Sequence, residues 1–312
     1  MTVVGVTGAS GFLGRYLVDH LAAKTDARVR ALTRTLGAEH AEHAHVTWMQ
    51  GDLNSPGDCA TFVDGVDAIV HLAHANTPLT SNAHLPADAL VNLVPSLTLL
   101  QAIRDSGSRP QVVLASSGGA VYQPRTSGEP IDEDAPAAPA SSYGIQKLAL
   151  EHYLRMAAAE GWLTATALRI GNAYGTLLPR ERLQGFIGVA LNHVLHDEPV
   201  RVFGDWNNVR DYVHLEDLSQ AFLAAAEQRD EFEVYNIGSG VGHSVREILS
   251  LLEQLTEAKV PVEFDDPTAA AERLPSWVVL DVTKARERLG WEARIELESG
   301  LRRLWNEVWR ER

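Results

Sequence analysis

The sequence predicts an α/β protein built on a doubly wound parallel sheet, with a smaller C-terminal α/β lobe. Three observations support this. Short apolar segments alternate with helix-length amphipathic segments up to about residue 170, as strands and helices do around a parallel sheet. A glycine-rich turn joins the first strand-like segment to the first helix-like one. Tyr143 stands four residues before Lys147, which is one turn of a helix.

The first turn predicts a phosphate-binding loop. Residues 2–7 form an apolar, β-branched run, and residues 11–23 carry helical periodicity. The glycines between them follow a G-x-x-G-x-x-G spacing, which lets the backbone approach a pyrophosphate at the helix N-terminus. Three glycines could also serve only the turn itself. We expect a Rossmann-like dinucleotide site, formed by Gly8, Gly11, Phe12, Leu13 and Gly14.

The end of the second strand bears on the choice between NAD and NADP. After the strand at 28–32, an acidic residue would hold the ribose hydroxyls of NAD, but the chain has Thr33 and Arg34 there. A guanidinium suits the 2′-phosphate of NADP, so these residues favour NADP, although Arg34 could equally be a solvated loop cation. The next strands, expected at 46–50 and 68–72, lead to further cofactor contacts at Asp52, Leu53, Leu72 and Ala73.

The Tyr143/Lys147 pair is the candidate for catalysis. On a helix the two side chains share a face, and an ammonium beside a phenol favours the phenolate. We therefore expect the pKa of Tyr143 to fall below its ordinary value of about 10, which would make it an acid or base near neutral pH. The alternative is an exposed helix pair with a half-buried aromatic ring.

The composition excludes several classes of function. The 312 residues carry a net charge of −14 without a basic run, which argues against nucleic acid or a membrane surface as a partner. We find no apolar stretch near the roughly 20 residues of a spanning helix, and no signal-like N-terminal segment. The single cysteine, Cys59, cannot form an intrachain disulfide. These features predict a cytoplasmic protein.

The remaining pattern predicts where two lobes divide. We assign residues 1–170, continued by parts of 205–240, to a dinucleotide-binding domain, and 171–312 mainly to a substrate-binding lobe. A Pro-, Ala- and acid-rich segment at 124–139 predicts a surface loop. The further helices expected are 88–105, 141–160, 185–197, 215–228, 244–257 and 297–310. The further strands expected are 112–116, 165–170, 200–203 and 234–237.

Eight short segments occur in an order that resembles a known family. They are Gly8/Gly11/Gly14, Gly51-Asp52-Leu53, His71-Leu72-Ala73, the run from Ser116 to Tyr122, Tyr143/Lys147, the run from Leu168 to Gly175, the run from Arg210 to His214 and the run from Tyr235 to Gly240. Together they resemble the extended short-chain dehydrogenase/reductases, and among these the NAD-dependent epimerase/dehydratase family that includes UDP-galactose 4-epimerase. The resemblance covers nearly the whole chain. It implies a nucleotide-sugar 4-epimerase, acting on a UDP-hexose or related nucleotide-diphosphate sugar by transient C4 oxidation with a bound nicotinamide cofactor.

The resemblance also assigns roles to single residues. Tyr143 would transfer the proton at the sugar hydroxyl, and Lys147 would tune it and hold the nicotinamide ribose. Asn172 would touch the diphosphate or the sugar and Arg210 would hold the diphosphate. Arg273 lacks the expected Arg-Pro-Gly-Asp-like surroundings, so a surface arginine is an equal interpretation. The implied substrate contacts are Ser117, Gly118, Asn172, Val202, Phe203, Arg210 and Arg273, with Ser116 on the cofactor side.

One departure from the family's pattern concerns the hydroxyl that orients the substrate. Epimerases of this type usually place Ser or Thr four residues before the tyrosine of the Val-Tyr pair, and this chain has Gly118 there. Ser117 is the nearest replacement, although a shift of one residue along a strand turns a side chain to the opposite face. Otherwise water or the cofactor ribose would supply the bond.

Three other functions stay open. Thr33 and Arg34 favour an NADPH-dependent 4-ketoreductase of a nucleotide 4-keto-6-deoxy sugar, because NADPH suits net reduction. A dehydratase would need an acid/base pair after the fifth strand, and Gly119 and Ala120 offer neither. A non-catalytic dinucleotide-binding protein is the third, because fold alone never establishes activity.

Metal binding and assembly complete the expectations. The histidine clusters at 40–45 and 71–74 could hold a metal ion, but no Cys/His pattern accompanies them, and we expect none. The resemblance implies a homodimer formed through the helices at 88–105 and 141–160.

Overall fold

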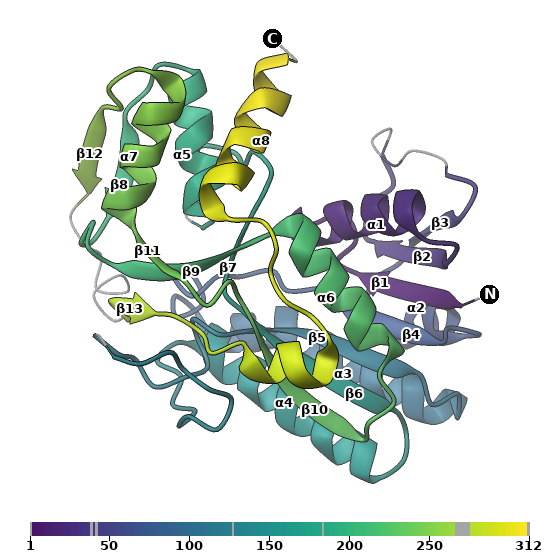
Figure 1. Ribbon diagram of the computed structural model, residues 1–312. Helices are drawn as coiled ribbons and strands as arrows, with labels where there is room; N and C mark the ends of the chain where they lie inside the picture. The colour runs from purple at the N-terminus through teal and green to yellow at the C-terminus, as the bar shows by residue number, and fades with distance from the viewer. Residues whose placement is uncertain are drawn as a thin grey trace.

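The computed structural model describes residues 2–37, 40, 43–126, 128–182, 184–265 and 275–310. Its larger lobe is a seven-stranded, all-parallel sheet in the order β10-β6-β5-β4-β1-β2-β3 (Figure 1). The strands are β1 (Val3–Thr7), β2 (Arg28–Thr33), β3 (Val46–Gln50), β4 (Ala68–His71), β5 (Gln111–Ser117), β6 (Thr164–Ile170) and β10 (Phe232–Ile237). The predicted fold class is confirmed. The strand order reverses between β1 and β4, and ligands of such sheets bind at the carboxyl ends beside this point.

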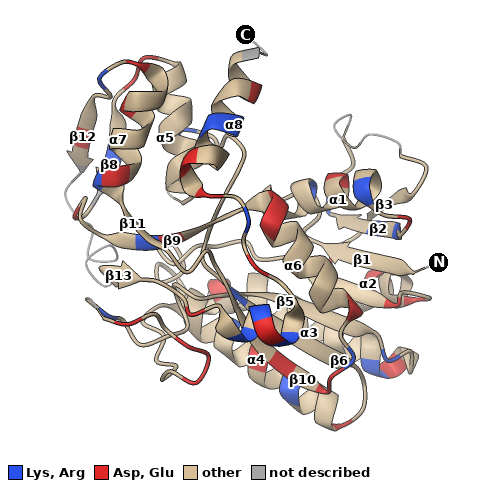
Figure 2. Cartoon of the chain, viewed as in Figure 1, with Lys and Arg blue, Asp and Glu red and all other residues tan. Residues whose placement is uncertain are grey.

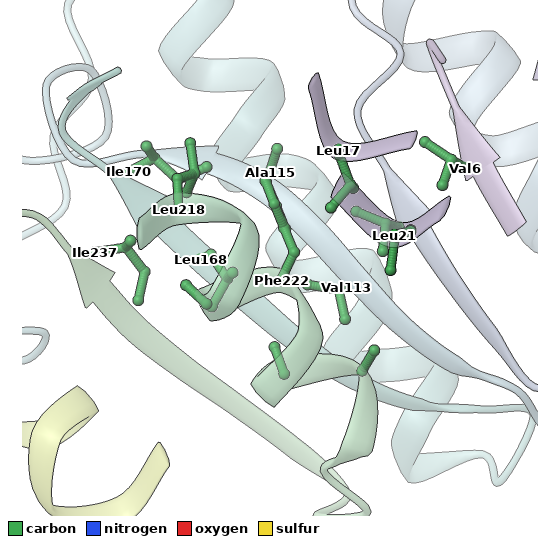
Figure 3. Packing of buried hydrophobic residues seen from close by; sticks show 14 of the residues in the cluster. Val6, Leu17, Leu21, Val113, Ala115, Leu168, Ile170, Leu218, Phe222 and Ile237 are labelled. Carbon is green, nitrogen blue, oxygen red and sulfur yellow. The ribbon is translucent and has the colours of Figure 1, made fainter. Parts of the chain in front are cut away.

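Two helices, α1 (Phe12–Lys24) and α6 (Leu215–Glu227), cover one face of this sheet. Leu17 and Leu21 of α1 and Phe222 of α6 are almost fully buried. They pack with Val113 of β5 and neighbouring strand residues, as Figure 3 shows. Burying such side chains contributes roughly 1.5–3 kcal/mol each, so this core holds the glycine-rich turn before α1 in place.

Three helices cover the opposite face: α2 (Pro56–Val63), α3 (Leu85–Ser106) and α4 (Ser142–Ala159). The sequence prediction missed α2, although Ser55 caps it by accepting a hydrogen bond from the Asp58 amide at 3.2 Å and a proline opens its first turn. Its eight residues are too few to establish a clear period.

The expectation that no segment has the length and apolarity of a spanning helix is wrong for α3. This helix runs 22 residues, continues through the buried Pro95 and ends at Gly107, whose φ of 66° provides a left-handed cap. Its residues Leu99 and Ile103 are buried against α2 and the sheet. The core helix of a folded domain meets the same length and composition criteria.

Within its described residues, the smaller lobe has two short sheets and three helices (Figure 1). In one sheet β9 (Val209–His214) pairs with β7 (Asn172–Tyr174), β11 (Gly242–Ser244) and β13 (Trp277–Val278). In the other, β8 (Val200–Phe203) runs parallel to β12 (Val262–Asp265). The helices are α5 (Phe186–Leu195), α7 (Val245–Thr256) and α8 (Leu297–Arg310). They bury Leu191, Leu252 and Leu301 in a core of their own.

The chain crosses between the lobes more than once. After β9, helix α6 and strand β10 return to the large sheet, where β10 becomes the edge strand beside β6. A π-helical turn, η2 (Ala285–Leu289), packs near β10 before α8. The loop expected at 124–139 has no helix or regular strand among its described residues, and it makes single bridges at Arg125 and Ile131 to the segment around β13.

Candidate active site

A cavity of about 680 Å³ lies at the carboxyl ends of the large sheet, between the two lobes. Its wall combines the turn before α1, the ends of β2, β4 and β5, the start of α4, and parts of β7, β8 and β9 from the smaller lobe. The predicted site residues in this wall are Gly8, Gly11, Phe12, Leu13, Gly14, Thr33, Arg34, Asp52, Leu53, Leu72, Ala73, Ser116, Ser117, Tyr143, Lys147, Asn172, Val202 and Arg210.

The glycine-rich turn fits a dinucleotide pyrophosphate. Gly8 has a φ of 66°, and a Cβ there would lie 2.8 Å from the Ala73 amide nitrogen. At Gly14 a Cβ would lie 2.2 Å from the Gly8 carbonyl oxygen, so the turn closes only with glycine. The N-cap of α1 is Gly11, which supplies no capping side chain. The first backbone N–H groups of α1 therefore stand ready for an anion.

Thr33 and Arg34 at the end of β2 both belong to the cavity wall, but only Arg34 has an exposed side chain. Thr33 is buried, and its hydroxyl lies 3.1 Å from Ser10 Oγ and 3.0 Å from the Thr35 carbonyl oxygen. Arg34 is exposed in the cavity wall, and its carbonyl accepts a hydrogen bond from Gln50. Any group on the 2′ carbon of a bound adenosine would therefore meet a cation here instead of a carboxylate.

Tyr143 and Lys147 lie together at the start of α4. Ser141 caps the helix by accepting a hydrogen bond from the Gly144 amide at 3.2 Å, and Ser81 accepts one from the Tyr143 amide at 3.1 Å. The Lys147 ammonium lies 5.6 Å from the centroid of the Tyr143 ring. Lys147 is only 3% exposed. One helical turn therefore places a phenol and a buried ammonium at the same point of the cavity.

The pKa of Tyr143 moves opposite to the predicted direction. Burial raises it to about 12, and a hydrogen bond with Ser117 only partly opposes the effect. The pKa of Lys147 falls to about 8, again because of burial, and the nearby Glu151 carboxylate limits that fall. For both groups the cost of desolvation is the largest influence, and it exceeds the opposing effect of Ser117 on Tyr143 and of Glu151 on Lys147.

Ser116 and Ser117 at the end of β5 point to different partners. Ser116 is buried, and its hydroxyl donates a hydrogen bond to Glu151 of α4. Ser117 is the residue whose hydroxyl meets the Tyr143 phenol. Successive residues of a strand face opposite sides. Ser117 is thus the hydroxyl beside the candidate catalytic tyrosine, and Ser116 supports α4 from within.

Gly118 does not reach the cavity wall. A Cβ at this position would lie 2.7 Å from Leu280 Cδ1, so a side chain here would point toward the segment after β13. Gly118 therefore lies outside the wall in which the predicted substrate contact would form, and a larger residue would collide with Leu280. Of the remaining predictions, Arg273 lies outside the described residues, and the side chain of Phe203 is likewise not described.

The cavity gathers positive charge in an acidic protein. Arg182, Arg201 and Arg210 join Arg34 in its wall. Figure 2 shows a blue segment on β9, where this strand crosses between the lobes. Arg210 is its only Lys or Arg, and burial lowers the pKa of that guanidinium. An anionic ligand would offset this cost of desolvation, because its charge would attract the Arg210 guanidinium and accept hydrogen bonds from it.

A carboxylate on the next residue holds Arg210 in position. Asp211 is fully buried and accepts hydrogen bonds from the backbone amides of Ser239, Gly240 and Leu280 at 2.6, 3.1 and 3.2 Å. These amides come from the loop after β10 and from the segment after β13. Two distant segments of the chain therefore hold β9 in place next to the cavity.

Comparison with known proteins agrees with this geometry. The family described as "NAD dependent epimerase/dehydratase family" matches residues 4–238. The chain belongs to this family. The sequence resemblance is thereby confirmed, and the family covers the whole large sheet together with β7, β8 and β9 of the smaller lobe.

Individual members of the epimerase/dehydratase family align over most of the chain. A UDP-glucose 4-epimerase of Mycolicibacterium smegmatis is 32% identical over 306 residues, or 95% of each protein. The dTDP-4-dehydro-6-deoxyglucose reductase of Escherichia coli is 30% identical over 239 residues, 77% of this chain and 74% of the reductase. The crystal structure of a Thermotoga maritima UDP-glucose 4-epimerase with UDP-glucose matches with a TM-score of 0.89 and 31% identity over 99% of both chains.

This epimerase/dehydratase cavity also contains residues that the sequence prediction did not assign. Arg182 and Arg201 are two of them, and His74, considered only as a metal ligand, is a third. None belongs to a motif, and each reaches the cavity from a separate loop or strand. Among the described residues no group of three or more His, Cys, Asp or Glu side chains is placed to hold a metal ion.

Proposed function

We propose that this protein is a nucleotide-sugar 4-epimerase acting on a UDP-hexose or a related sugar with a bound NAD. The observation that carries the proposal is a single cavity that contains the glycine-rich turn, the Ser117–Tyr143–Lys147 group and four arginines. The glycine-rich turn suits a dinucleotide, the Ser117–Tyr143–Lys147 group suits a sugar hydroxyl, and the arginines suit a diphosphate. The epimerase relative and the solved epimerase, which both align over nearly the whole chain, support the same activity.

The residues of this chain would handle the proton and hold the substrate. Tyr143 would accept the proton of the C4 hydroxyl, with the hydrogen bond from Ser117 favouring its ionised form. Lys147 would stay close as the cation that favours the phenolate. When bound, the oxidised nicotinamide supplies the acceptor for the C4 hydride and a further positive charge near the phenol. Burial at this point excludes water that would compete for the proton.

The remote part of the substrate would be anchored in the smaller lobe. Arg210 and Arg201 suit a diphosphate, and Asn172 on β7 offers an amide beside them. Val202 lies in the same wall and would pack against the base. An anchor distant from the reacting carbon leaves the hexose free to turn, so that the hydride could return to its opposite face.

The decisive test uses the protein as purified. We expect a mass spectrum to identify bound NAD, and the protein to interconvert UDP-glucose and UDP-galactose without added coenzyme. No net oxidation should be detected, because the hydride returns to the same carbon. Failure to convert any of a panel of nucleotide sugars, with dinucleotide present, would refute the epimerase assignment.

A second candidate is an NADPH-dependent 4-ketoreductase of a nucleotide 4-keto-6-deoxy sugar. Arg34 at the end of β2 favours it, because the 2′ carbon of a bound adenosine would lie near this position and the chain has an arginine there instead of an acidic residue. The aligned E. coli protein is itself a reductase of a dTDP-4-dehydro sugar. Consumption of added NADPH only in the presence of a 4-keto sugar would establish this activity in place of epimerisation.

We further propose a homodimer through α3 and α4. These helices pack together and leave large apolar side chains exposed, among them Leu90, Val94, Ile145 and Met156. Leu100 and Leu154 of the same two helices are instead buried within the chain's own core. Exposed apolar patches of this kind mark interfaces. Sedimentation should show a dimer that Leu90→Arg with Met156→Arg converts to a monomer, and a dimer in the double variant would contradict the proposal.

A further inference from the structure

His74 lies in the cavity beside the candidate catalytic tyrosine, and the function proposed above gives it no role. It follows β4 by three residues and belongs to the cavity wall. Its ring meets the Tyr143 ring edge to face, with centroids 4.8 Å apart and planes at 87°. A ligand group that contacts His74 would therefore lie next to Tyr143, the candidate residue for proton transfer.

Both ring nitrogens of His74 are buried, and neither has a hydrogen-bond partner among the described residues. A neutral imidazole has one N–H donor and one acceptor nitrogen, whichever way the ring is turned. Leaving such groups buried and unpaired costs about 1–3 kcal/mol each. A hydroxyl group can act as a donor or as an acceptor, so a ligand hydroxyl at this point of the cavity would pair with one of the two ring nitrogens, whichever role that nitrogen has.

The backbone on both sides of His74 is fixed. The Ala73 amide donates to Thr7 Oγ1 at 3.3 Å, and the Ala75 amide donates to Asn92 Oδ1 at 2.6 Å. These acceptors lie on β1 and α3, so two elements of the large lobe hold the loop from each end. The imidazole is thus presented to the cavity by a rigid support, and binding would cost little ordering of the chain.

The neighbouring histidine shows what a structural role looks like in this protein. His71 Nδ1 lies 2.8 Å from Thr7 Oγ1, and His71 Nε2 lies 2.9 Å from Ser96 Oγ. Ser96 in turn donates to the Asn92 carbonyl at 2.7 Å. Both nitrogens of His71 are therefore satisfied within the chain, whereas those of His74 have no partner in the part of the chain that the structure describes.

His74 also stays uncharged. Burial, followed by the nearby Lys147 ammonium and His71, lowers the pKa of its imidazole to about 2. At any pH at which the protein works, the ring would act as a neutral donor and acceptor and not as a cation. This property suits an uncharged hydroxyl better than a phosphate.

We propose that His74 is a binding residue that hydrogen-bonds a hydroxyl of the bound ligand next to Tyr143. The hydroxyl belongs either to the hexose or to the ribose of the coenzyme, since both carry the same chemistry and both would lie in this cavity. The inference rests on the proposed function, because it needs a sugar or a dinucleotide in the site.

The test compares three variants of the holoprotein. His74→Phe keeps the ring beside Tyr143 but removes both polar atoms, His74→Gln keeps a donor and an acceptor, and His45→Phe makes the same change at an exposed histidine outside the cavity. Calorimetric titration gives the dissociation constants of UDP-glucose and of UDP, which lacks the hexose. A mass spectrum gives the amount of dinucleotide retained per subunit. If His74→Phe does not fold, His74→Ala replaces it.

The two sources of the hydroxyl give different results. A contact to the hexose predicts about a tenfold weaker UDP-glucose affinity in His74→Phe, corresponding to one lost hydrogen bond, with UDP affinity and dinucleotide content unchanged. A contact to the coenzyme predicts reduced dinucleotide content instead. In both cases His74→Gln should recover most of the loss and His45→Phe should match the wild type.

The assignment fails if His74→Phe retains dinucleotide and binds both nucleotides as the wild type does. It also fails if His74→Gln loses as much as His74→Phe, because packing against Tyr143 would then explain the effect. A wild-type protein that retains no dinucleotide and binds no UDP-glucose would refute the proposed function, and this assignment with it.

Discussion

Tyr143→Phe is expected to lower kcat by about a thousandfold, since positioned acid–base groups contribute roughly 10²–10⁴ in rate. The change removes one oxygen and leaves the ring, its edge contact with His74 and the Lys147 neighbour in place. Substrate and coenzyme should therefore bind as in the wild type. The measurement is kcat for UDP-glucose and UDP-galactose interconversion, with binding of UDP-glucose followed separately.

The matched control is Tyr153→Phe, at an exposed tyrosine on the same helix. It should keep wild-type turnover, which would show that loss of a phenol from α4 is harmless away from the cavity. Near-normal turnover in Tyr143→Phe would remove this residue from the mechanism. Loss of turnover together with loss of bound coenzyme would instead indicate damage to the site.

Glu151→Gln should destabilise the protein by about 3 kcal/mol, because a buried cation loses its partner. Arg169 Nη2 lies 2.8 Å from Glu151 Oε2, and both side chains are nearly inaccessible to solvent. Lys147 lies one turn before Glu151 on α4 and is buried too. The amide keeps the shape of the side chain but leaves two buried cations without a nearby carboxylate. Chemical denaturation measures the loss.

The same substitution should also change the pH dependence of the reaction. Burial lowers the pKa of Lys147 to about 8 even though the Glu151 carboxylate raises it. Without that carboxylate, Lys147 loses its proton at a lower pH. If the reaction needs the ammonium form, activity should decline at lower pH in Glu151→Gln than in the wild type, as a pH profile of kcat would show.

A surface ion pair supplies the control for Glu151. Glu253→Gln removes the same charge from a pair with the exposed Lys259, where solvent screening leaves little to lose. It should alter neither stability nor the pH profile measurably. If Glu151→Gln lowers stability but leaves the decline of kcat at high pH unchanged, Glu151 stabilises the fold without affecting the pKa of Lys147.

Local sequence patterns were sufficient to predict most helices and strands of the large lobe. The glycine spacing, the β-branched runs and the helical periodicity each depend on residues close together in the chain, and β1, α1 and α4 formed within one or two residues of the predicted bounds. The strands β7, β9, β11, β12 and β13 and the helix α2 escaped prediction. The helix and the shorter strands contain too few residues for a period, and the pairing partners of all five strands lie far away in sequence.

The candidate site divides in the same way. The sequence by itself determined the dinucleotide fold and the Tyr143/Lys147 pair, because glycine geometry and a four-residue spacing are local properties. Tertiary structure alone decided the upward shift of the Tyr143 pKa, the contact between Ser117 and Tyr143, and the presence of His74 and Arg182 in the cavity. Burial and electric field at a side chain are set by whatever the fold packs around it, and most of those atoms come from distant parts of the chain.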